Sequence, residues 1–437
     1  MRSRHLSAVL LLLFFWSGLR PAGAGQGWHE AALASFDEAW QVINDTYPDP
    51  SFGGLDWAAV RDELRPEAEQ ADSPEGVRRV IRRMLARLGQ SHFVLLSPSG
   101  TRVRGEAGLG IDVRLSASDV VIVRVTAGSS AAAAGLRPGD VIRRVGDQPA
   151  EAWLAEAAGE DERARAADAL ERAAIALSGE PGTDVTLVVD DGERERSVTV
   201  AREREEGQVV RFGNLPPLVV RVEASERATA NRHRVGVIAF NVWMTAATNG
   251  IDTAVDRFRD ADGLVLDLRG NRGGLVEMIR GVAGHVIGDP IPLGRMQTRQ
   301  AALPLPVNPR LSTSDGRSVA PFSGPLAILV DELTASASEC FAGSLQSLGR
   351  ARVFGRQTMG QALPAATRRL PSGDVLMHVI GDFVTPSGVR LEGEGVVPDQ
   401  PVALSVQSLR EGRDATLEAA LSWIDTWLAR KARRSLP

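Results

Sequence analysis

The chain has 437 residues, of which 43% are apolar and 24% are charged. This composition is typical of globular proteins, and the length suggests two to four domains. The net charge of −5 excludes the basic surface that nucleic-acid binding requires, so we expect no nucleic-acid partner. Cys340 is the only cysteine, which leaves it no intramolecular disulfide partner, and we expect it to be a small buried residue.

Residues 1–24 have the pattern of a secretory signal peptide. Arg2 and Arg4 precede an apolar run over 6–15, and the small residues at 22–24 are typical of a cleavage site. The apolar run is short for a membrane span. Removal of residues 1–24 takes away three arginines and no acidic residues, which brings the net charge to about −8. We therefore expect a secreted protein, periplasmic or extracellular, without stable membrane insertion after processing.

The chain after the signal divides into four regions. Apolar residues at helical spacing predict a helical region over 25–98. Residues 104–203 contain strand patterns near 108–113, 120–125 and 185–189, with a helix near 162–178, and form a separate module. From 210 to 405, apolar strands at 235–240, 263–268 and 326–330 alternate with helices over 248–259 and 275–287. Such βα units predict an α/β core whose sheet is covered on both faces. Residues 406–437 carry an amphipathic helix over 413–428 and a basic tail.

The module over 104–203 carries two glycine-containing motifs, Gly108-Leu109-Gly110-Ile111 and Ala134-Gly135-Leu136-Arg137-Pro138-Gly139-Asp140. Together they resemble a PDZ domain of the permuted type found in secreted proteases. In such domains a peptide C-terminus adds as a strand, and backbone N–H groups of the glycine loop hold its carboxylate. The resemblance implies that Gly108, Leu109, Gly110 and Ile111 bind the peptide. A β-rich linker domain without a ligand is the alternative.

The segment Thr334-Ala335-Ser336-Ala337-Ser338-Glu339 lies between the apolar strand at 326–330 and a helical pattern. A small-residue turn there can hold a hydroxyl at a helix N-terminus, where N–H groups favour negative charge. The segment resembles the nucleophile region of the C-terminal-processing, or tail-specific, serine peptidases. That resemblance implies that Ser336 attacks the substrate. It also implies a crotonase-like, or Clp-protease-like, β-β-α core.

The base of that family is a lysine that follows a Thr-x-Gly motif. In this chain Thr358-Met359-Gly360 is followed by Gln361, and the only lysine, Lys431, lies in the basic tail. A Ser–Lys dyad is therefore not expected. A serine hydroxyl needs some base to take its proton. Either another residue supplies that base or the chain is inactive.

The pair Ser91-His92 offers a base. Leu88-Gly89-Gln90-Ser91-His92-Phe93 resembles the Asp-Ser-His-Thr-Tyr element of tricorn-type peptidases, which use histidine. The resemblance implies that His92 is the base, that Ser91 orients its ring and that Glu392 orients Ser91. Glu394 is the competing carboxylate, and a histidine that merely caps a helix end is the alternative for His92. We expect His233, which lies between two arginines, to face solvent.

An oxyanion in such a site needs two N–H donors. Asp267-Leu268-Arg269-Gly270-Asn271-Arg272-Gly273-Gly274 matches the Asp-Leu-Arg-x-Asn-x-Gly-Gly loop of the same family. The resemblance implies that the N–H of Ala337 is one donor and that Gly273, or next Gly274, supplies the other.

Together these resemblances imply a secreted serine endopeptidase that cleaves bonds near exposed C-termini of proteins or peptides through an acyl-enzyme. No metal-ligand spacing or phosphate loop is present, so we expect no cofactor and no metal. The oligomeric state is left open. One alternative is an inactive homologue that binds peptides through its PDZ module, since loss of the lysine fits a degenerate peptidase. A second is a binder of a hydrophobic small molecule, like retinoid-binding members of the superfamily, which lack the PDZ module.

Overall fold

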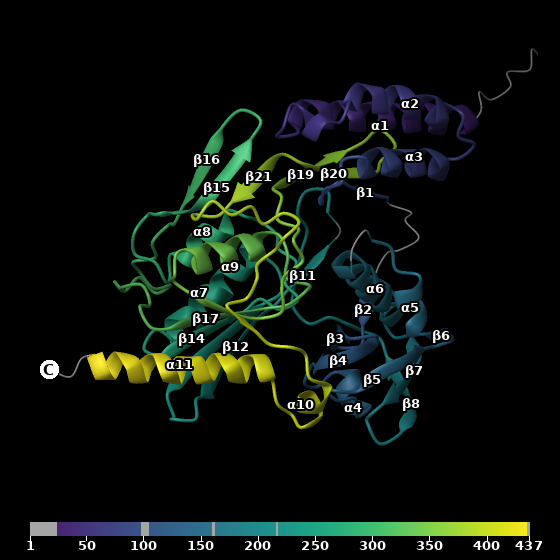
Figure 1. Cartoon of the computed structure of the whole chain (residues 1–437). Coiled ribbons are helices and arrows are strands. Elements are labelled where there is room, and N and C mark those ends of the chain that lie inside the picture. Colours follow the sequence, from purple (N-terminus) through teal and green to yellow (C-terminus); the bar gives the residue numbers. More distant parts are fainter. Residues whose placement is uncertain (1–23, 98–104, 160–161, 216, 435–437) are drawn as a thin grey trace, which may run out of the picture.

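The structure is a computed structural model that describes residues 24–97, 105–159, 162–215 and 217–434 (Figure 1). The predicted signal segment therefore lies almost wholly outside the described residues. Within the described ranges no helix is both long and apolar enough to span a membrane.

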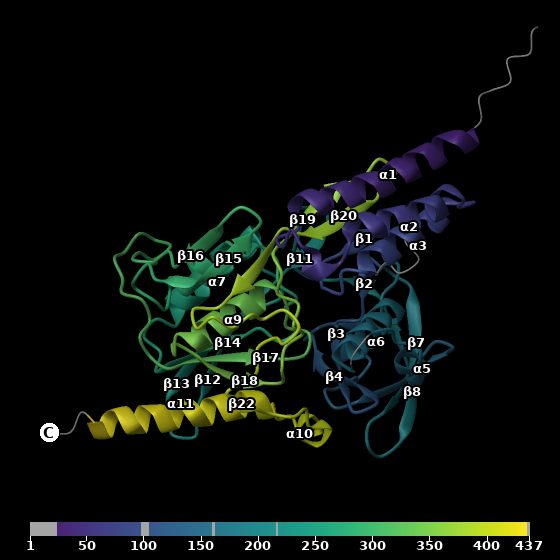
Figure 2. The same ribbon diagram turned by 45° about the horizontal axis from the view of Figure 1, so that its top comes forward.

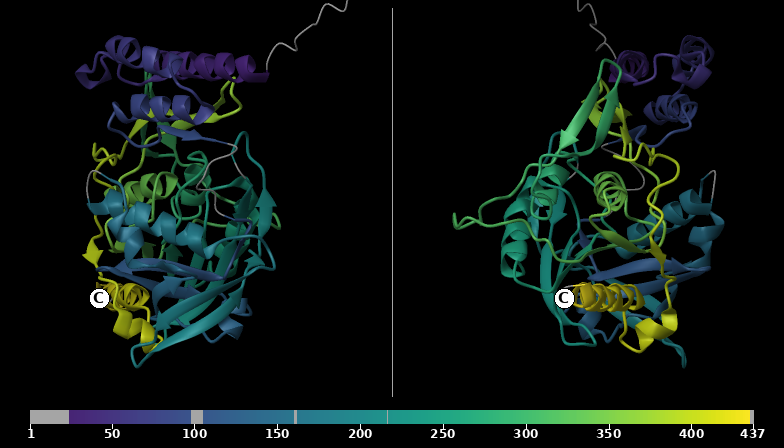
Figure 3. Two further views of the ribbon diagram at one scale, coloured as in Figure 1. Left: turned by 90° about the vertical axis from the view of Figure 1, so that its right-hand side faces the viewer. Right: turned by 60° about the vertical axis from the view of Figure 1, so that its left-hand side comes forward.

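The N-terminal region is a three-helix unit. Its helices bury one apolar cluster that includes Phe36, Leu64 and Met84. Asp56 and Ser73 cap the second and third helices by accepting the N–H groups of Ala59 and Gly76. In both views of Figure 3 this unit stands at the opposite end of the molecule from the C-terminal helix. The elements are α1 (Ala24–Thr46), η1 (Phe52–Gly54), α2 (Trp57–Glu69) and α3 (Pro74–Ala86).

A small sheet ties this unit to the C-terminal part of the chain. The strand β1 (Val94–Leu96) starts two residues after His92 and pairs antiparallel with β20 (Val375–Val379). That strand pairs in turn with β19 (Ala365–Arg369). The pairing places the Ser91-His92 segment beside the chain that follows Gln361.

The second region is a β-rich unit over 107–204. Its sheet has the order β3-β4-β5-β7-β8, with β6 paired to β5. The helix α6 packs against β3. Apolar residues such as Leu109, Ile122 and Leu187 form the core of the β-rich unit. The elements are β2 (Ala107–Gly108), β3 (Ile111–Ser116), β4 (Asp119–Val125), α4 (Ser130–Ala133), β5 (Val141–Val145), β6 (Gln148–Pro149), α5 (Glu151–Ala155), α6 (Glu162–Leu177), β7 (Asp184–Asp190), β8 (Glu195–Ala201) and β9 (Glu203–Arg204). A ribbon of β10 (Gln208–Val210) and β11 (Leu218–Val220) follows.

The third region is a mixed α/β core built on a sheet of order β12-β13-β14-β17-β18-β22. Only β12 runs antiparallel to its neighbour; the other pairs are parallel. The sheet strands are β12 (Val222–Ala228), β13 (Arg234–Phe240), β14 (Gly263–Asp267), β17 (Leu326–Val330), β18 (Arg352–Gly355) and β22 (Gln400–Pro401). The helical elements that follow β13, β14 and β17 are η2 (Thr245–Ala247), α7 (Thr248–Arg257), α8 (Met278–Ala283) and α9 (Ala337–Ser347).

Both faces of this sheet are covered, which confirms the predicted α/β architecture. Leu264 and Ile328 point to one face, where they pack in one cluster with α7, α8 and α9. Val265 and Leu329, one residue further along, point to the other face and pack against α11 (Ala415–Arg434). Figure 1 shows α11 on the far side of the sheet from α9. The long apolar strands follow from this double burial.

Two further elements flank the core. The strands β15 (Pro292–Thr298) and β16 (Ala302–Pro306) form a hairpin that pairs with β21 (Gly381–Val384). The short helix α10 (Val406–Arg410) lies beside the β-rich unit (Figure 2), where the Arg410 guanidinium donates to the carbonyl of Gly139 at 3.0 Å.

The C-terminal helix also corrects one prediction. His233 does not simply face solvent, because its Nδ1 lies 2.7 Å from a carboxylate oxygen of Asp425 in α11. The same carboxylate accepts the N–H of Asn231 at 3.2 Å. This contact fastens α11 to the turn between β12 and β13.

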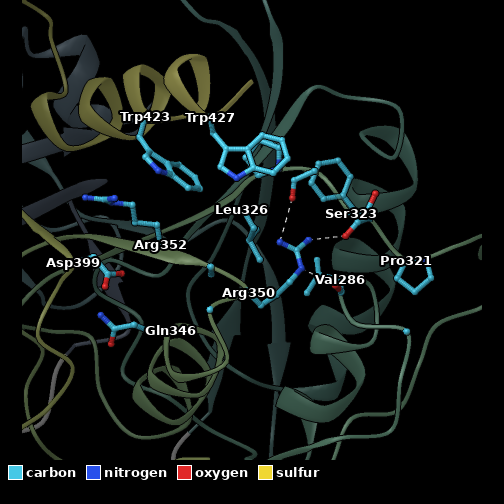
Figure 4. Close-up of a pocket in the computed structure, with 16 residues that line it drawn as sticks. Val286, Pro321, Ser323, Leu326, Gln346, Arg350, Arg352, Asp399, Trp423 and Trp427 are labelled. Atoms are coloured by element: carbon cyan, nitrogen blue, oxygen red, sulfur yellow. Dashed lines mark hydrogen bonds between the residues drawn. The ribbon is translucent and has the colours of Figure 1, made fainter. Parts of the chain in front are cut away.

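A pocket of about 850 Å³ lies beside α11. Trp423 and Trp427 form one wall, and Arg350 lies opposite them (Figure 4). The guanidinium of Arg350 donates to three backbone carbonyls, those of Val286, Phe322 and Gly324, so its role is to hold these loops together. None of the predicted site residues lines this pocket.

Candidate active site

Ser336 occupies the turn between β17 and α9 in a conformation that non-glycine residues rarely adopt. Its φ is 56° and its ψ is −122°. The Ser336 N–H donates to the carbonyl of Gln361 at 2.7 Å and to the Glu339 carboxylate at 3.0 Å. Ser336 is half-buried, whereas Ala335 and Ala337 on either side are buried. The turn therefore holds one hydroxyl at the start of α9, as in a nucleophile elbow.

The buried side chain of Glu339 holds this turn in place through hydrogen bonds. It is fully buried, and its carboxylate accepts the N–H groups of Gly360 at 2.7 Å and Gln361 at 3.0 Å as well as that of Ser336. It also accepts the hydroxyl of Thr358. Burial raises the pKa of Glu339 to about 6, although these donors act in the opposite direction. This role of Glu339 was not predicted from the sequence, although the Ser-x-x-Glu pattern of a capping box could have indicated it.

Ser91, His92 and Glu392 form a hydrogen-bonded series. Glu392, which is buried, accepts the Ser91 N–H at 2.9 Å and the Ser91 hydroxyl at 3.0 Å. The Ser91 oxygen lies 2.6 Å from Nδ1 of His92. Since the Ser91 hydroxyl donates to the carboxylate, its oxygen accepts from Nδ1–H, and Nε2 carries the free lone pair. Burial lowers the pKa of His92 to about 4, so its ring is neutral at neutral pH.

This series lies next to the nucleophile turn, although His92 and Ser336 are 244 residues apart in the chain. Two consecutive residues connect them. The carbonyl of Gln361 accepts the Ser336 N–H, and the Ala362 N–H donates to the Glu392 carboxylate at 2.9 Å. The Gln361 side chain itself is exposed. No hydrogen bond joins His92 to Ser336 directly in this structure.

Glu394, the competing carboxylate, is exposed and does not contact Ser91. Its backbone carbonyl accepts hydrogen bonds from Gln357 at 2.7 Å and from Arg163 of α6 at 2.8 Å. Of the two glutamates, Glu392 is thus the one that reaches the Ser91-His92 pair.

The glycine loop after β14 lies against Ser336. An added Cβ on Gly273 would lie 2.6 Å from the Cβ of Ser336 and 2.9 Å from the backbone nitrogen of Ala337. Its φ is +94°, so both space and backbone require glycine. The Gly273 N–H donates to the buried Asn271 side chain at 3.0 Å. The Gly274 N–H has no hydrogen-bond partner among the described residues.

One buried ion pair joins the β-rich unit to the loop before Ser336 and to the glycine loop. Arg114 of β3 lies 2.6 Å from the carboxylate of Asp331, with side-chain exposures of 9% and 4%. Asp331 follows β17 and also accepts the N–H of Gly270 at 2.8 Å, in the glycine loop. Burial acts to raise the pKa of Asp331, but Arg114 and the Gly270 N–H outweigh it and hold the pKa below its ordinary value. Leu333 and Met359 pack against the apolar cluster of the same unit.

The predicted peptide-binding residues Gly108, Leu109, Gly110 and Ile111 form the connection between β2 and β3. Gly110 has a φ of +77°, and its carbonyl accepts the N–H of Thr126 at 2.7 Å. Leu109 is buried in the core of the unit. Across the described ranges, no three or more His, Cys, Asp or Glu residues cluster so as to hold a metal ion.

Three family models match the chain. Residues 234–402 match peptidase family S41, residues 29–86 match the tricorn protease C1 domain, and residues 98–163 match the PDZ domain. These matches fall on the α/β core, the helical unit and the β-rich unit respectively.

Individual relatives agree with these models. The chain is 29% identical over 395 residues to the carboxyl-terminal-processing protease of Picosynechococcus sp., which covers 85% of each chain. It is 27% identical over 385 residues to chloroplastic carboxyl-terminal-processing peptidase 2 of Arabidopsis thaliana, covering 85% of this chain and 68% of that one. The solved photosystem II D1 C-terminal processing protease has a TM-score of 0.57 at 24% identity and covers 90% of this chain and 97% of its own, which shows the shared fold.

The fold and these matches define a serine peptidase. More particularly, the α/β core over residues 234–402 matches peptidase family S41, and the relatives of the chain include C-terminal-processing peptidases. The predicted family and class of enzyme are thereby confirmed.

Proposed function

We propose that this S41 peptidase is a secreted endopeptidase that uses a Ser–His pair in place of the family's Ser–Lys dyad. The observation that carries the proposal is the hydrogen-bonded series from Glu392 through Ser91 to His92, whose carboxylate accepts the N–H of Ala362, next to the residue that accepts the Ser336 N–H. A buried carboxylate at one end and a neutral imidazole at the other are what a general base of this type needs.

In the proposed reaction the Ser336 oxygen attacks the peptide carbonyl while Nε2 of His92 takes its proton. The negative oxygen of the tetrahedral intermediate accepts N–H bonds from Ala337 and from Gly273 or Gly274. His92 returns the proton to the leaving amine, the C–N bond breaks and an acyl-enzyme ester remains. Water then attacks the ester while His92 takes its proton, and the ester C–O bond breaks as His92 returns the proton to the Ser336 oxygen and the carboxylic acid product leaves. Ser91 and Glu392 hold the ring through both steps.

We further propose that substrates are recognised by their free C-termini. The connection from Gly108 to Ile111 would hold the terminal carboxylate, and the peptide would add along the β-rich unit. Residues 1–24 would be the signal peptide, 25–98 the helical region, 104–203 the PDZ domain, 210–405 the peptidase core and 406–437 the C-terminal segment. Processing at residue 24 would place the enzyme in the periplasm or outside the cell.

The test is cleavage of a folded reporter protein that carries an unstructured apolar C-terminal tail. We expect the processed chain to shorten this reporter and a Ser336→Ala variant to leave it intact. A reporter whose C-terminus is amidated should be cleaved more slowly, since the terminal carboxylate is lost. Equal cleavage by the Ser336→Ala variant would refute the enzyme. Reporter binding without cleavage by the parent would favour an inactive, peptide-binding homologue.

A further inference from the structure

Trp243 connects the glycine loop to the nucleophile helix. It follows β13 and is fully buried. Its backbone N–H donates to the carbonyl of Gly273 at 2.9 Å, and its indole Nε1–H donates to the hydroxyl of Ser338 at 2.8 Å. Ser338 is the second residue of α9, directly after Ala337. One side chain and its own backbone therefore bridge the two loops that face each other across the reacting centre.

The backbone contact fixes which way the Gly273–Gly274 peptide points. In a trans peptide the C=O and the next N–H point in opposite directions. The Gly273 carbonyl points to the backbone of Trp243, so the Gly274 N–H points away from Trp243. Ser336 lies against Gly273, as the 2.6 Å approach of an added Cβ shows. The Gly273 N–H is occupied by Asn271. Of these two N–H groups, only that of Gly274 lacks a partner among the described residues, which leaves it as the donor for an oxyanion at Ser336.

The indole contact fixes α9 relative to this peptide. Trp243 packs edge-on against Phe240, with ring centroids 4.8 Å apart, and at an angle against Phe341 of α9 at 5.1 Å. These contacts leave the indole one orientation, in which its N–H reaches Ser338. A phenylalanine would fill much of the same space but would leave the buried Ser338 hydroxyl without its donor.

We propose that Trp243 is a positioning residue for the oxyanion site: it holds the Gly273–Gly274 peptide and the start of α9 in register, so that the N–H groups of Gly274 and Ala337 converge on one point. The inference rests on the proposed peptidase mechanism. Gly274, and not Gly273, is then the second oxyanion donor. Trp243 acts on the site without contact with the substrate or with Ser336. A shift in either loop would weaken binding of the developing negative charge while leaving ground-state peptide binding unchanged.

The test compares Trp243→Phe, Ser338→Ala and the double variant by steady-state kinetics on a fluorogenic peptide. We expect each single variant to lose about ten-fold in kcat with little change in KM, because the donors move but remain. We expect the double variant to lose no more than the worse single one, since both changes break the same contact. Affinity for a peptide aldehyde, which forms a tetrahedral adduct with Ser336, should fall by the same factor as kcat/KM.

The matched control is Trp153→Phe, because Trp153 is a buried tryptophan of the β-rich unit. It should keep the parent kinetics even if its thermal stability falls. Parent-like kcat in Trp243→Phe or Ser338→Ala, or multiplicative losses in the double variant, would overturn the inference. So would equal losses in the control. If Trp243→Phe does not fold, the small change Ser338→Ala still decides. An inactive parent would instead refute the proposed function itself.

Discussion

Glu392 accepts two hydrogen bonds from Ser91, one from its backbone N–H at 2.9 Å and one from its hydroxyl at 3.0 Å. This double contact leaves the Ser91 oxygen as an acceptor for Nδ1–H of His92. It therefore selects the tautomer in which Nε2 is basic. The Glu392 carboxylate acts on His92 through Ser91, so removal of the carboxylate charge should change the tautomer of the His92 ring.

Replacement of Glu392 by glutamine tests this relay. The amide would present a donor to Ser91 in place of one carboxylate oxygen, so the tautomer of His92 would no longer be fixed. We expect kcat/KM to fall by at least about 100-fold, within the range of general acid–base catalysis. Glu394→Gln is the matched control, since Glu394 is exposed, and it should keep parent activity. Equal losses in both variants would contradict the assignment of Glu392.

The pH dependence of kcat/KM reports the groups of the free enzyme. Protonation of His92 removes the base. Because the pKa of His92 is lowered from its ordinary value of 6.5 to about 4, the ring stays neutral as the pH falls from 6.5 toward 4. Glu339, with a pKa of about 6, takes up its proton at a higher pH than His92 does. Its protonation removes one hydrogen-bond acceptor from the turn of Ser336. As pH falls we expect a partial loss near 6 and a complete loss near 4. A single complete loss centred at 6.5 would show that His92 is not desolvated.

The ion pair between Arg114 and Asp331 should be important for stability. Arg114→Met would leave a buried carboxylate without its partner, at a cost of about 3–5 kcal/mol in free energy of unfolding. The Gly270 N–H shares that carboxylate, so activity should fall too. Arg124→Met is the control, because the pair of Arg124 with Asp112 is partly exposed and should contribute at most about 1 kcal/mol. Denaturant unfolding measures both, and similar losses would contradict the buried pair's role.

The close approach of Gly273 to Ser336 predicts a steric loss of function. In Gly273→Ala the new methyl group would lie 2.6 Å from the Cβ of Ser336, on a backbone whose φ of +94° disfavours alanine. We expect no measurable peptidase activity in a folded variant. Gly281→Ala in α8 is the control, because its added methyl group meets nothing within 4 Å. Peptidase activity of Gly273→Ala near that of the control would show that the glycine loop lies further from the nucleophile.

Local patterns made much of this site predictable from the sequence. The strand 326–330 matches β17, and the small-residue turn after it holds Ser336 at the start of α9. The order of helical unit, β-rich unit and α/β core likewise follows from periodicity and motifs. The helix expected over 413–428 continues to Arg434 in the structure, since alanine and arginine there favour helix even without an apolar face.

Contacts between residues far apart in the chain could not be predicted from the sequence. The acceptor role of Glu339 depends on N–H groups some twenty residues further on, at Gly360 and Gln361. The pairing of Arg114 with Asp331 joins two units that no local pattern relates, in a chain with many arginines. His233 was misplaced for the same reason, because Asp425 reaches it from α11. Which glycine donates to an oxyanion depends on peptide orientation, which only the coordinates of Trp243 and Asn271 define.

Labelling by a serine-directed fluorophosphonate at neutral pH would show whether His92 activates Ser336. We expect the processed chain to be labelled and both Ser336→Ala and His92→Ala to be unlabelled, with thermal unfolding transitions that show that the variants fold. Labelling lost in Ser336→Ala but retained in His92→Ala would contradict the claim, since another base would then serve the nucleophile. Absence of labelling in the folded parent would contradict an activated Ser336 altogether.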